Sequence, residues 1–405
     1  MTCKINADTS DGLKLISDTS GAVEIQSNGV TKVSIDSSGN ISTVAGMSTS
    51  NGNIAPLRPN AKPIIINGNM AIAQRSAAVT GLGDGDEGYV TVDRIRHTHD
   101  GTTAGRYTST HEAVDDIPGF HESLNINVTT ADTSIAAGEG FNLEYKFEGH
   151  DLHHLQKGHS TAKPFTISFY AKADAAVVYG VEFKDADNNR HCTRTFTTTT
   201  GWTRHVLAFP ADTTGKYNND NGHSASFRIW LHAGSNFTSG TAAAVFQGVT
   251  TANTAVGIGS IFASTDRFIS ITGLQMEIGD YDINSIPDFQ YESFGDNLFR
   301  CQRYCTAITK EASYGPVMMA HGIDANVCRG AYFFRTPMRS APSFTHTGNI
   351  IRSFDAATAL SSATAVSSRF SHSIDWTGSN LFAANEGILI TFDTGTASLI
   401  YSAEL

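Results

Sequence analysis

The sequence predicts an all-β protein. Only 17% of its 405 residues are charged, 37 are glycine, and Thr, Ser and Asn are abundant. Long helices rely on Ala, Leu, Glu and Lys, whereas this composition suits short strands joined by Gly, Asn and Asp turns. Apolar and polar residues also alternate with a period of two along most of the chain. We expect, in order, a short β repeat, a jelly-roll β-sandwich, a linking helix and a smaller β-sandwich.

Residues 1–45 carry the β repeat. In GLKLISDTSGAVEIQSNGVTKVSIDSSGNI (residues 12–41), the strands LKLI, AVEIQ and VTKVSI are separated by Gly-containing turns, and glycine recurs about every nine residues. Strands this few and short bury too little apolar area to be stable alone. One face must be covered by something else, most simply by copies of the same segment or by a larger docking surface. The repeat therefore predicts a protein that assembles.

A linker and the start of the central domain follow. Residues 46–63 are rich in Ser, Gly, Asn and Pro, the composition of a linker. The central domain, residues 64–293, then opens with IIINGNMAIAQRS (residues 64–76). We expect the three isoleucines to form a first strand, Asn-Gly to form a turn, and Met70 and Ile72 to return to the core.

Further strands of the central domain show clear alternation and end at Gly, Pro, Asn or Asp. They are PFTISFYAKA (164–173), VVYGVEFKD (177–185), RHCTRTFTTTT (190–200), WTRHVLAFP (202–210), ASFRIWLHAG (225–234) and RFISITGLQMEIG (267–279). About ten strands without internal repeats fit a β-sandwich of the jelly-roll type.

The pattern changes in FGDNLFRCQRYCTAI (residues 294–308), where Asp296 can cap a helix. One helical stripe carries Leu298, Cys301, Tyr304 and Cys305. We expect a short linking helix here. Residues 309–405 return to strands, in GAYFFRTP, SFTHTG, GILITFDTG and ASLIYSAEL, and predict the smaller β-sandwich, a candidate receptor-binding tip.

Charge and composition exclude several classes of function. The chain has 28 basic and 39 acidic residues, a formal charge of −11, and no basic cluster, so nucleic acid is not an expected partner. No signal-peptide pattern opens the sequence, and no apolar run approaches the roughly 20 residues that span a bilayer. We expect cytoplasmic synthesis and no membrane insertion. Five scattered cysteines predict buried thiols and no disulfide framework.

Two Ser motifs imitate the nucleophile elbow of hydrolases. They are GHSTA (158–162) and GHSAS (222–226). An elbow needs a strand before the serine and a helix after it, whereas strand patterns follow or include both of these serines. We expect no catalytic residue in either motif.

Two acidic segments resemble oxygen-rich calcium loops. In GLGDGDEG (81–88), with Asp84 and Asp86, and in DADNN (185–189), an EF-hand loop would require a later glutamate, and hydrophobic residues stand in its place. Plain hairpin turns are the simpler interpretation, and a structural calcium in another geometry is the alternative.

The histidines concentrate between residues 97 and 159. On a strand, His97 and His99 point to the same side, and three such pairs around a trimer axis would offer six imidazoles to a transition metal. Exposed or hydrogen-bonded histidine is the simpler interpretation, so both residues are weak metal candidates.

Six segments occur in a fixed order. They are IIINGNMAIAQRS, VDRI (92–95), WTRHVLAFPADTTG (202–215), WLHAGSNFTSG (230–240), ITGLQMEIGDYD (271–282) and CQRY (301–304). This series resembles the fibre-like minor structural proteins of tailed bacteriophages, whose sandwich resembles carbohydrate-binding modules. The repeat ending in SIDSSGNI is similar to the shaft or attachment segment of phage fibres. Ile95 and Cys305 depart from the aromatic residues that the pattern has at those places.

The resemblance implies a non-enzymatic tail fibre located in the virion. It would be a homotrimer that binds other tail or capsid proteins through residues 1–45 and a host envelope glycan through its sandwiches. One alternative is a structural head fibre, decoration or connector protein without receptor binding. The other is a polysaccharide-degrading tailspike, which is disfavoured because no long array of β-helix coils follows residue 45.

Tryptophan is the natural candidate for contact with a glycan, because sugar rings stack their C–H faces on aromatic rings. Trp202 and Trp230 belong to strand patterns and are expected in the core. Trp376 lies at a turn in SIDWTGSN beside Asp375 and Asn380. We expect these last three residues to form an exposed ligand site.

Overall fold

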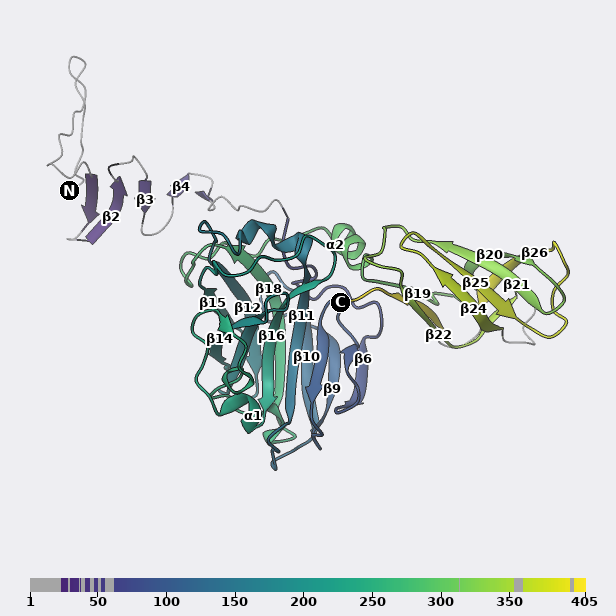
Figure 1. Cartoon of the computed structure of the whole chain (residues 1–405), viewed down its shortest axis with the longest axis horizontal. Helices are drawn as coiled ribbons and strands as arrows, with labels where there is room; N and C mark the ends of the chain where they lie inside the picture. Colours follow the sequence, from purple (N-terminus) through teal and green to yellow (C-terminus); the bar gives the residue numbers. More distant parts are fainter. Residues whose placement is uncertain are drawn as a thin grey trace, which may run out of the picture. The chain divides into compact units, whose positions relative to one another are not determined.

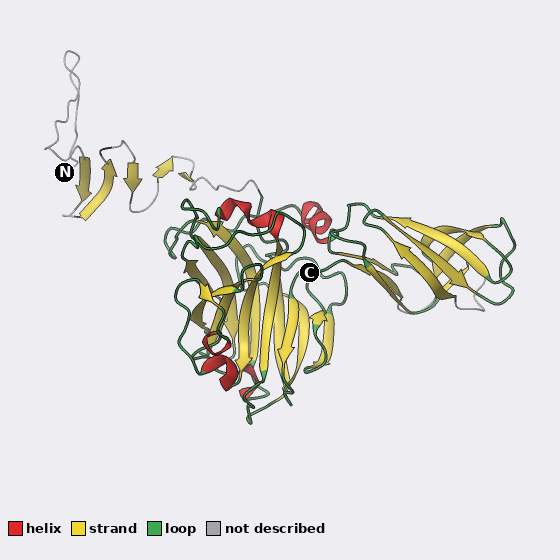
Figure 2. Cartoon of the chain, viewed as in Figure 1, coloured by secondary structure: helices red, strands yellow, loops and turns green. Residues whose placement is uncertain are grey.

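The computed structural model describes residues 23–27, 30–35, 37, 41–43, 47–49, 52–54, 62–312, 314–352, 360–393 and 397–405. The chain divides into two compact units, residues 1–58 with 282–287 and residues 59–281 with 288–405. Strands dominate the described residues and helices are few and short (Figure 2). The all-β prediction is confirmed.

The first unit contains two small antiparallel sheets. One consists of β1 (Val23–Ser27), β2 (Val30–Ile35) and β3 (Ile41–Thr43), and the other of β4 (Met47–Thr49) and β5 (Gly52–Ile54). The strands predicted in AVEIQ and VTKVSI are therefore present. The strand predicted in LKLI lies outside the described residues.

One face of the three-stranded sheet is apolar and uncovered. Val23 pairs with Ile35 and Ile25 pairs with Val33, so these four side chains share a face. None of the four is buried, and Ile25 is 57% exposed. Within the described residues of this unit, nothing covers the apolar face that the sequence predicted.

The central domain is a sandwich of two antiparallel sheets (Figure 1). The six-stranded sheet has the order β15 (Thr203–Phe209), β12 (Phe165–Ala173), β18 (Phe268–Ile278), β10 (Glu122–Thr130), β9 (Arg106–Ala113) and β6 (Ala78–Leu82). The seven-stranded sheet has the order β17 (Gln247–Gly248), β14 (Arg190–Thr197), β13 (Val178–Asp185), β16 (His223–Ala233), β11 (Gly140–Glu148), β8 (Arg96–Asp100) and β7 (Gly88–Tyr89).

Alternating side chains of both sheets form one core. Ile126, Phe169 and Ile269 from the six-stranded sheet meet Phe141 and Phe227 from the seven-stranded sheet, and each is at most 1% exposed. The intervening residues of each strand therefore face outward. Short helical segments connect the strands: η1 (Gly149–Leu155), α1 (Ser235–Thr238), η2 (Thr251–Asn253) and η3 (Ile261–Ala263).

The stretch IIINGNMAIAQRS enters the core without forming a strand, which corrects the prediction. Its isoleucines, Met70 and Ile72 are buried, but Asn67 and Met70 have positive φ angles of 60° and 57°. The Asn67 amide takes the place of a strand partner: Nδ2 donates to the carbonyls of Ile72 and Asp93, and Oδ1 accepts from the Ile72 N–H. The Asn67 side chain thus makes hydrogen bonds that a neighbouring strand would otherwise make, and asparagine tolerates the left-handed φ angle found at this position.

The linking helix α2 (Phe294–Cys301) is shorter than the predicted range of residues 294–308. Its N-cap residue also lies about one turn before Asp296, the cap that the sequence suggested. Ser293, not Asp296, is the N-cap: its hydroxyl accepts from the Asp296 N–H at 3.1 Å and donates to the Asp296 carboxylate. The predicted stripe is buried as expected at Cys301 and Tyr304, which pack with Ile66 and Ile72.

The last domain is a smaller β-sandwich, as predicted. A three-stranded sheet has the order β19 (Cys305–Thr309), β27 (Ser398–Ser402) and β22 (Ser343–Thr347). A six-stranded sheet has the order β23 (Ile350–Arg352), β26 (Gly387–Phe392), β20 (Pro316–Gly322), β21 (Val327–Phe333), β25 (Ser371–Thr377) and β24 (Ser361–Ser367). Its core includes Trp376, Ile390 and Tyr401.

Cys192, Cys301, Cys305 and Cys328 are free thiols, and their burial is as predicted for the cysteines that the structure describes. In the same residues, no helix has the length and apolar character needed to cross a membrane.

Candidate functional site

The outward face of the six-stranded sheet is covered at one end and open at the other. The β9–β10 loop folds over part of it, because Phe120 is buried against the rings of Tyr170, Phe289 and Tyr291 at centroid distances of 5.1–5.7 Å. Beyond this anchor, the face carries an open cleft of about 400 Å³, which we call the sheet-face cleft.

Trp202 lies at one side of the sheet-face cleft, where β15 begins. It is half-buried, and its indole Nε1–H donates to Asp116 Oδ1 at 2.6 Å. The other oxygen of Asp116 accepts from Lys172 Nζ at 2.5 Å. These hydrogen bonds, the one from Lys172 first, hold the pKa of the Asp116 carboxyl below its usual range. The carboxylate is therefore ionised at neutral pH and fixes the orientation of the indole.

Polar side chains from neighbouring strands cover the floor of the sheet-face cleft. Asn125 on β10 is opposite Ser270 on β18, and its Nδ2 donates to Ser270 Oγ at 2.9 Å. Asn127 is exposed and lies opposite Phe268. Glu112 completes this row, since the Ser270 hydroxyl donates to its Oε2 at 3.4 Å. The strands thus present amides, hydroxyls and carboxylates beside an aromatic ring.

The site predicted at Trp376 is wrong. In β25, buried and partly exposed residues alternate, and Trp376 falls on the inner side with Ile374 at 0% exposure. Asp375 points the other way and forms a two-point ion pair with Arg329 at 2.6 and 2.8 Å. Asn380 is exposed in the following turn. A buried indole cannot stack on a sugar ring, so these three residues do not form the expected ligand contact.

His97 and His99 share one side of β8, as predicted, but that side faces the core. His97 Nδ1 lies 2.8 Å from the Tyr107 hydroxyl and His99 Nε2 lies 3.3 Å from it. Burial lowers the pKa of His97 to about 3 and that of His99 to about 4. These rings are neutral hydrogen-bonding core residues, which confirms the simpler interpretation, and their burial does not support the weaker alternative of a metal site around a trimer axis.

The second acidic loop is a hairpin turn between the paired strands β13 and β14, whereas the first connects β6 to β7, which belong to different sheets, so the hairpin interpretation is wrong there. Asp84 and Asp86 are exposed between β6 and β7, and Asp86 accepts from the Gly83 N–H. Asp185, in the second loop, is buried and paired with Lys157 at 2.6 Å. Among the residues that the structure describes, no three or more His, Cys, Asp or Glu side chains are placed to hold a metal ion. A structural calcium stays a prediction.

The Ser motifs have the surroundings that the sequence predicted. Ser160 lies in a turn before β12, and Ser224 lies inside β16, fully buried. In neither motif does a helix follow the serine, so the strand–turn–helix geometry of an elbow is missing at both places.

Sequence reasoning missed Trp202 as a site residue and placed it in the core, whereas the core placement of Trp230 is confirmed at 2% exposure. One signal was present: Trp202 follows the segment TTTTG and precedes the strand pattern, so it stands at the end of a strand, where burial is less complete. Its partner Asp116 is 86 residues away in the chain, and no local pattern connects the two.

No protein-family model matches the sequence, and no curated protein matches it. Among solved structures, the chain is similar to the family 11 carbohydrate-binding module from Clostridium thermocellum in complex with a β-1,3-1,4-mixed-linked tetrasaccharide (TM-score 0.26, 11% identity, 51% of this chain and 99% of that chain). It is also similar to TmCBM61 in complex with β-1,4-galactotriose (0.27, 8%, 54% and 99%). A third is the tandem CBM22-1–CBM22-2 domain of Paenibacillus barcinonensis Xyn10C (0.24, 11%, 83% and 92%). At such low TM-scores and identities, these likenesses carry no functional conclusion for this chain.

Proposed function

We propose that the chain is a non-enzymatic glycan-binding fibre protein of a tailed-phage virion, and that its central sandwich binds saccharide in the sheet-face cleft. The observation that carries the glycan part is the half-buried Trp202, held by Asp116 beside a row of amide and hydroxyl groups. A fixed indole offers a stacking surface, and Asn125 and Asn127 offer donors and acceptors for sugar hydroxyls.

The charge of the sheet-face cleft favours a neutral saccharide. Glu112, Asp115 and Asp116 line it with a single cation, Lys172, which is already paired with Asp116. An acidic sugar would meet uncompensated negative charge there. The neutral units of a host envelope polysaccharide are therefore the proposed ligand.

The virion part of the proposal rests on the ordered motif series and on the uncovered face of the first unit. Val23, Ile25, Val33 and Ile35 share that face and none is buried. Two further copies of the same segment would cover it and produce a homotrimer, with the remaining surface available to tail or capsid proteins.

Glycan binding is tested with labelled full-length protein on host cells and with calorimetry on purified envelope polysaccharide. Replacing Trp202 by Ala is expected to weaken binding by about tenfold or more, because a central aromatic contact contributes roughly 2 kcal/mol. The matched control is Phe370→Ala, which removes an aromatic ring that is 62% exposed in the last sandwich. If Trp202→Ala binds like the unmodified protein while Phe370→Ala does not, the ligand site belongs to the last sandwich instead.

Assembly is tested by light scattering. Ile25→Asp places a charge on the uncovered face and is expected to reduce the mass from that of a trimer to that of a monomer. Gln26→Asp, an exposed neighbour in the same strand, is the control. A trimer that binds no host cell and labels capsid faces would favour the second candidate, a structural head fibre or decoration protein.

A further inference from the structure

A second hollow of about 400 Å³ lies beside η1, and we call it the donor pocket. Its polar lining includes His153, Gln156, His159, Thr161, Lys216 and Tyr217. None of the eight lining residues is Asp or Glu, although the chain has 39 acidic and only 28 basic residues. The donor pocket is therefore chemically opposite to the sheet-face cleft.

Lys157 also lines the donor pocket, but it acts as a tether. Its ammonium is 2.6 Å from Asp185 Oδ2 and 3.1 Å from Asp212 Oδ2, and it donates to the carbonyls of Thr214 and Gly215. Both carboxylates are nearly inaccessible to solvent. Their charge is matched internally, and these bonds fix the loop that carries Lys216 and Tyr217.

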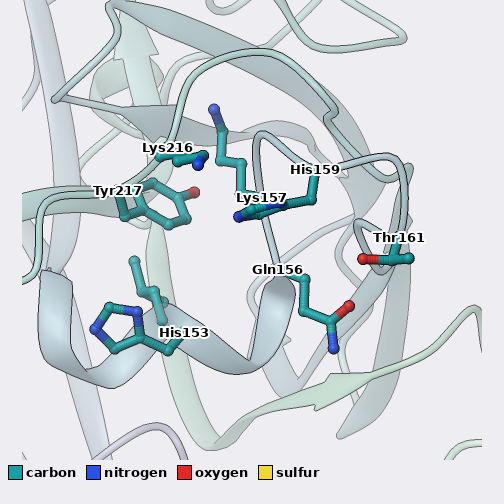
Figure 3. Close-up of a pocket in the computed structure, with 8 residues that line it drawn as sticks. His153, Gln156, Lys157, His159, Thr161, Lys216 and Tyr217 are labelled. Carbon is teal, nitrogen blue, oxygen red and sulfur yellow. The ribbon is translucent and has the colours of Figure 1, made fainter.

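The remaining groups come from two facing segments. His153 and Gln156 lie on one side, at the end of η1, and Lys216 and Tyr217 lie on the other (Figure 3). His153 Nε2 is 2.9 Å from Asn219 Oδ1, and because an amide oxygen only accepts, this nitrogen carries the proton and the ring is oriented. Lys216 and His159 are exposed and add cationic or N–H donor groups.

We propose that the donor pocket binds the anionic group of an acidic sugar, a carboxylate or a phosphate ester, with Lys216 and His159 as its main partners. The Lys216 ammonium and the His159 ring N–H, without a competing carboxylate in the lining, suit an oxyanion, and Tyr217 supplies a ring surface for the attached sugar. The protein would then read a charged unit here and a neutral unit in the sheet-face cleft.

The test uses calorimetric titration of the full chain with methyl glucuronide, glucose 6-phosphate and uncharged methyl glucoside. The anionic sugars are expected to bind and the uncharged one not to bind. Binding of the glucuronide alone identifies carboxylate sugars, and binding of the phosphate alone identifies phosphorylated ones. The double variant Lys216→Gln/His159→Asn should weaken binding at least about tenfold, since charge-assisted hydrogen bonds are lost. Lys184→Gln, a charge-matched change on β13 away from the pocket, should not weaken it.

Three results would overturn the proposal that the donor pocket binds anionic sugars. They are undiminished binding by the double variant, equal binding of methyl glucoside, and no binding of either anion. The Trp202→Ala variant separates this result from the proposed glycan site: it should bind the anionic sugars normally. The two proposals can therefore fail independently.

Discussion

At the scale of single residues, Lys157 is the clearest case of a buried charge whose position dictates local structure. Four oxygens from Asp185, Asp212 and two backbone carbonyls surround its ammonium, and the side chain is 4% exposed. Carboxylates and carbonyls are also the ligands that hard cations such as Ca²⁺ prefer. At the DADNN loop, the cation that these oxygens bind is the ammonium group of Lys157.

Replacing Lys157 by Met is expected to lower the free energy of unfolding by about 3–5 kcal/mol, because Asp185 would be left buried without its cation, whereas Asp212 would keep Arg190. Denaturant unfolding followed by fluorescence measures this change. Lys216→Met, at a nearby exposed lysine, should stay within about 0.5 kcal/mol. Adding Asp185→Asn to Lys157→Met should recover part of the loss. Equal effects of the two lysine substitutions would contradict the tether.

The tryptophans show what sequence could and could not predict at this scale. Trp230 sits in an unbroken apolar strand pattern, and the prediction of burial succeeded. Trp202 and Trp376 both stand beside turns, so their local patterns do not separate a cleft residue from a core residue. The difference comes from cross-strand register: β25 turns Trp376 inward, whereas Trp202 meets Asp116 from the β9–β10 loop.

At the scale of elements, the seven-stranded sheet is crossed by a ladder of alternating charges on its outward face. Glu144 on β11 is opposite Arg96 and Arg228, and Arg228 in turn is opposite Glu182. Arg228 bonds Glu144 at 2.7 Å and Glu182 at 3.4 Å. Cross-strand pairs of opposite charge stabilise a sheet, and here they also hold two buried carboxylates in the ionised form.

The ladder predicts a pH dependence. Burial alone would raise the pKa of Glu144, but Arg228, Lys146 and Ser226 outweigh it and lower this pKa to about 2. Because the folded-state pKa lies below the unfolded value, the stabilisation is present above about pH 4.5 and is lost as the pH falls towards 2. The contribution is on the order of 3 kcal/mol.

Acid titration followed by circular dichroism checks this expectation. Glu144→Gln should be less stable than the unmodified protein at pH 7, and the difference should shrink as the pH falls from about 4.5 to 2. Glu112→Gln, on an exposed residue of β9, should leave the acid profile unchanged. A stability difference for Glu144→Gln that is constant with pH would show that charge on Glu144 is not the cause.

Strands were the elements that sequence predicted best. The period-two patterns between residues 164 and 279 correspond to β12, β13, β14, β15, β16 and β18 with ends shifted by few residues. The strand predicted at Ile64–Ile66 is missing because side chains, not a neighbouring strand, make the hydrogen bonds of this region: the Ile66 N–H donates to the Tyr145 hydroxyl, and the Asn67 amide bonds Ile72. Such side-chain hydrogen bonds leave no periodic pattern in the sequence. The sheet-face cleft was not predicted for a related reason: its residues come from separate strands, and no local sequence pattern connects them.

At the scale of the whole second unit, three of the six motifs that carry the resemblance, IIINGNMAIAQRS, VDRI and CQRY, meet at the joint between its two sandwiches. Arg94 of VDRI bonds Glu404 of the last sandwich and lies 3.5 Å from the ring centroid of Tyr304 of CQRY. Gln74 of the opening motif donates to Asp93 and to the Cys305 carbonyl. The residues of these three motifs therefore stabilise this joint, whereas Trp202, which opens another motif of the series, lines the sheet-face cleft. Sequence order alone could not show that they converge.

The joint predicts coupled unfolding of the two sandwiches. Arg94→Met should leave Glu404 buried with Arg75 as its remaining cation, at a cost of roughly 3–5 kcal/mol. In differential scanning calorimetry, the unmodified protein should unfold the last sandwich together with the central one, whereas Arg94→Met should show a separate, earlier transition. Arg329→Met removes an exposed ion pair within the last sandwich and should shift no transition measurably. Proteolysis between residues 302 and 312 should accelerate only in Arg94→Met, because the segment beyond α2 is held by contacts across the joint. If both arginine variants melt alike, the last sandwich is stabilised by its own core and the motifs have a different role.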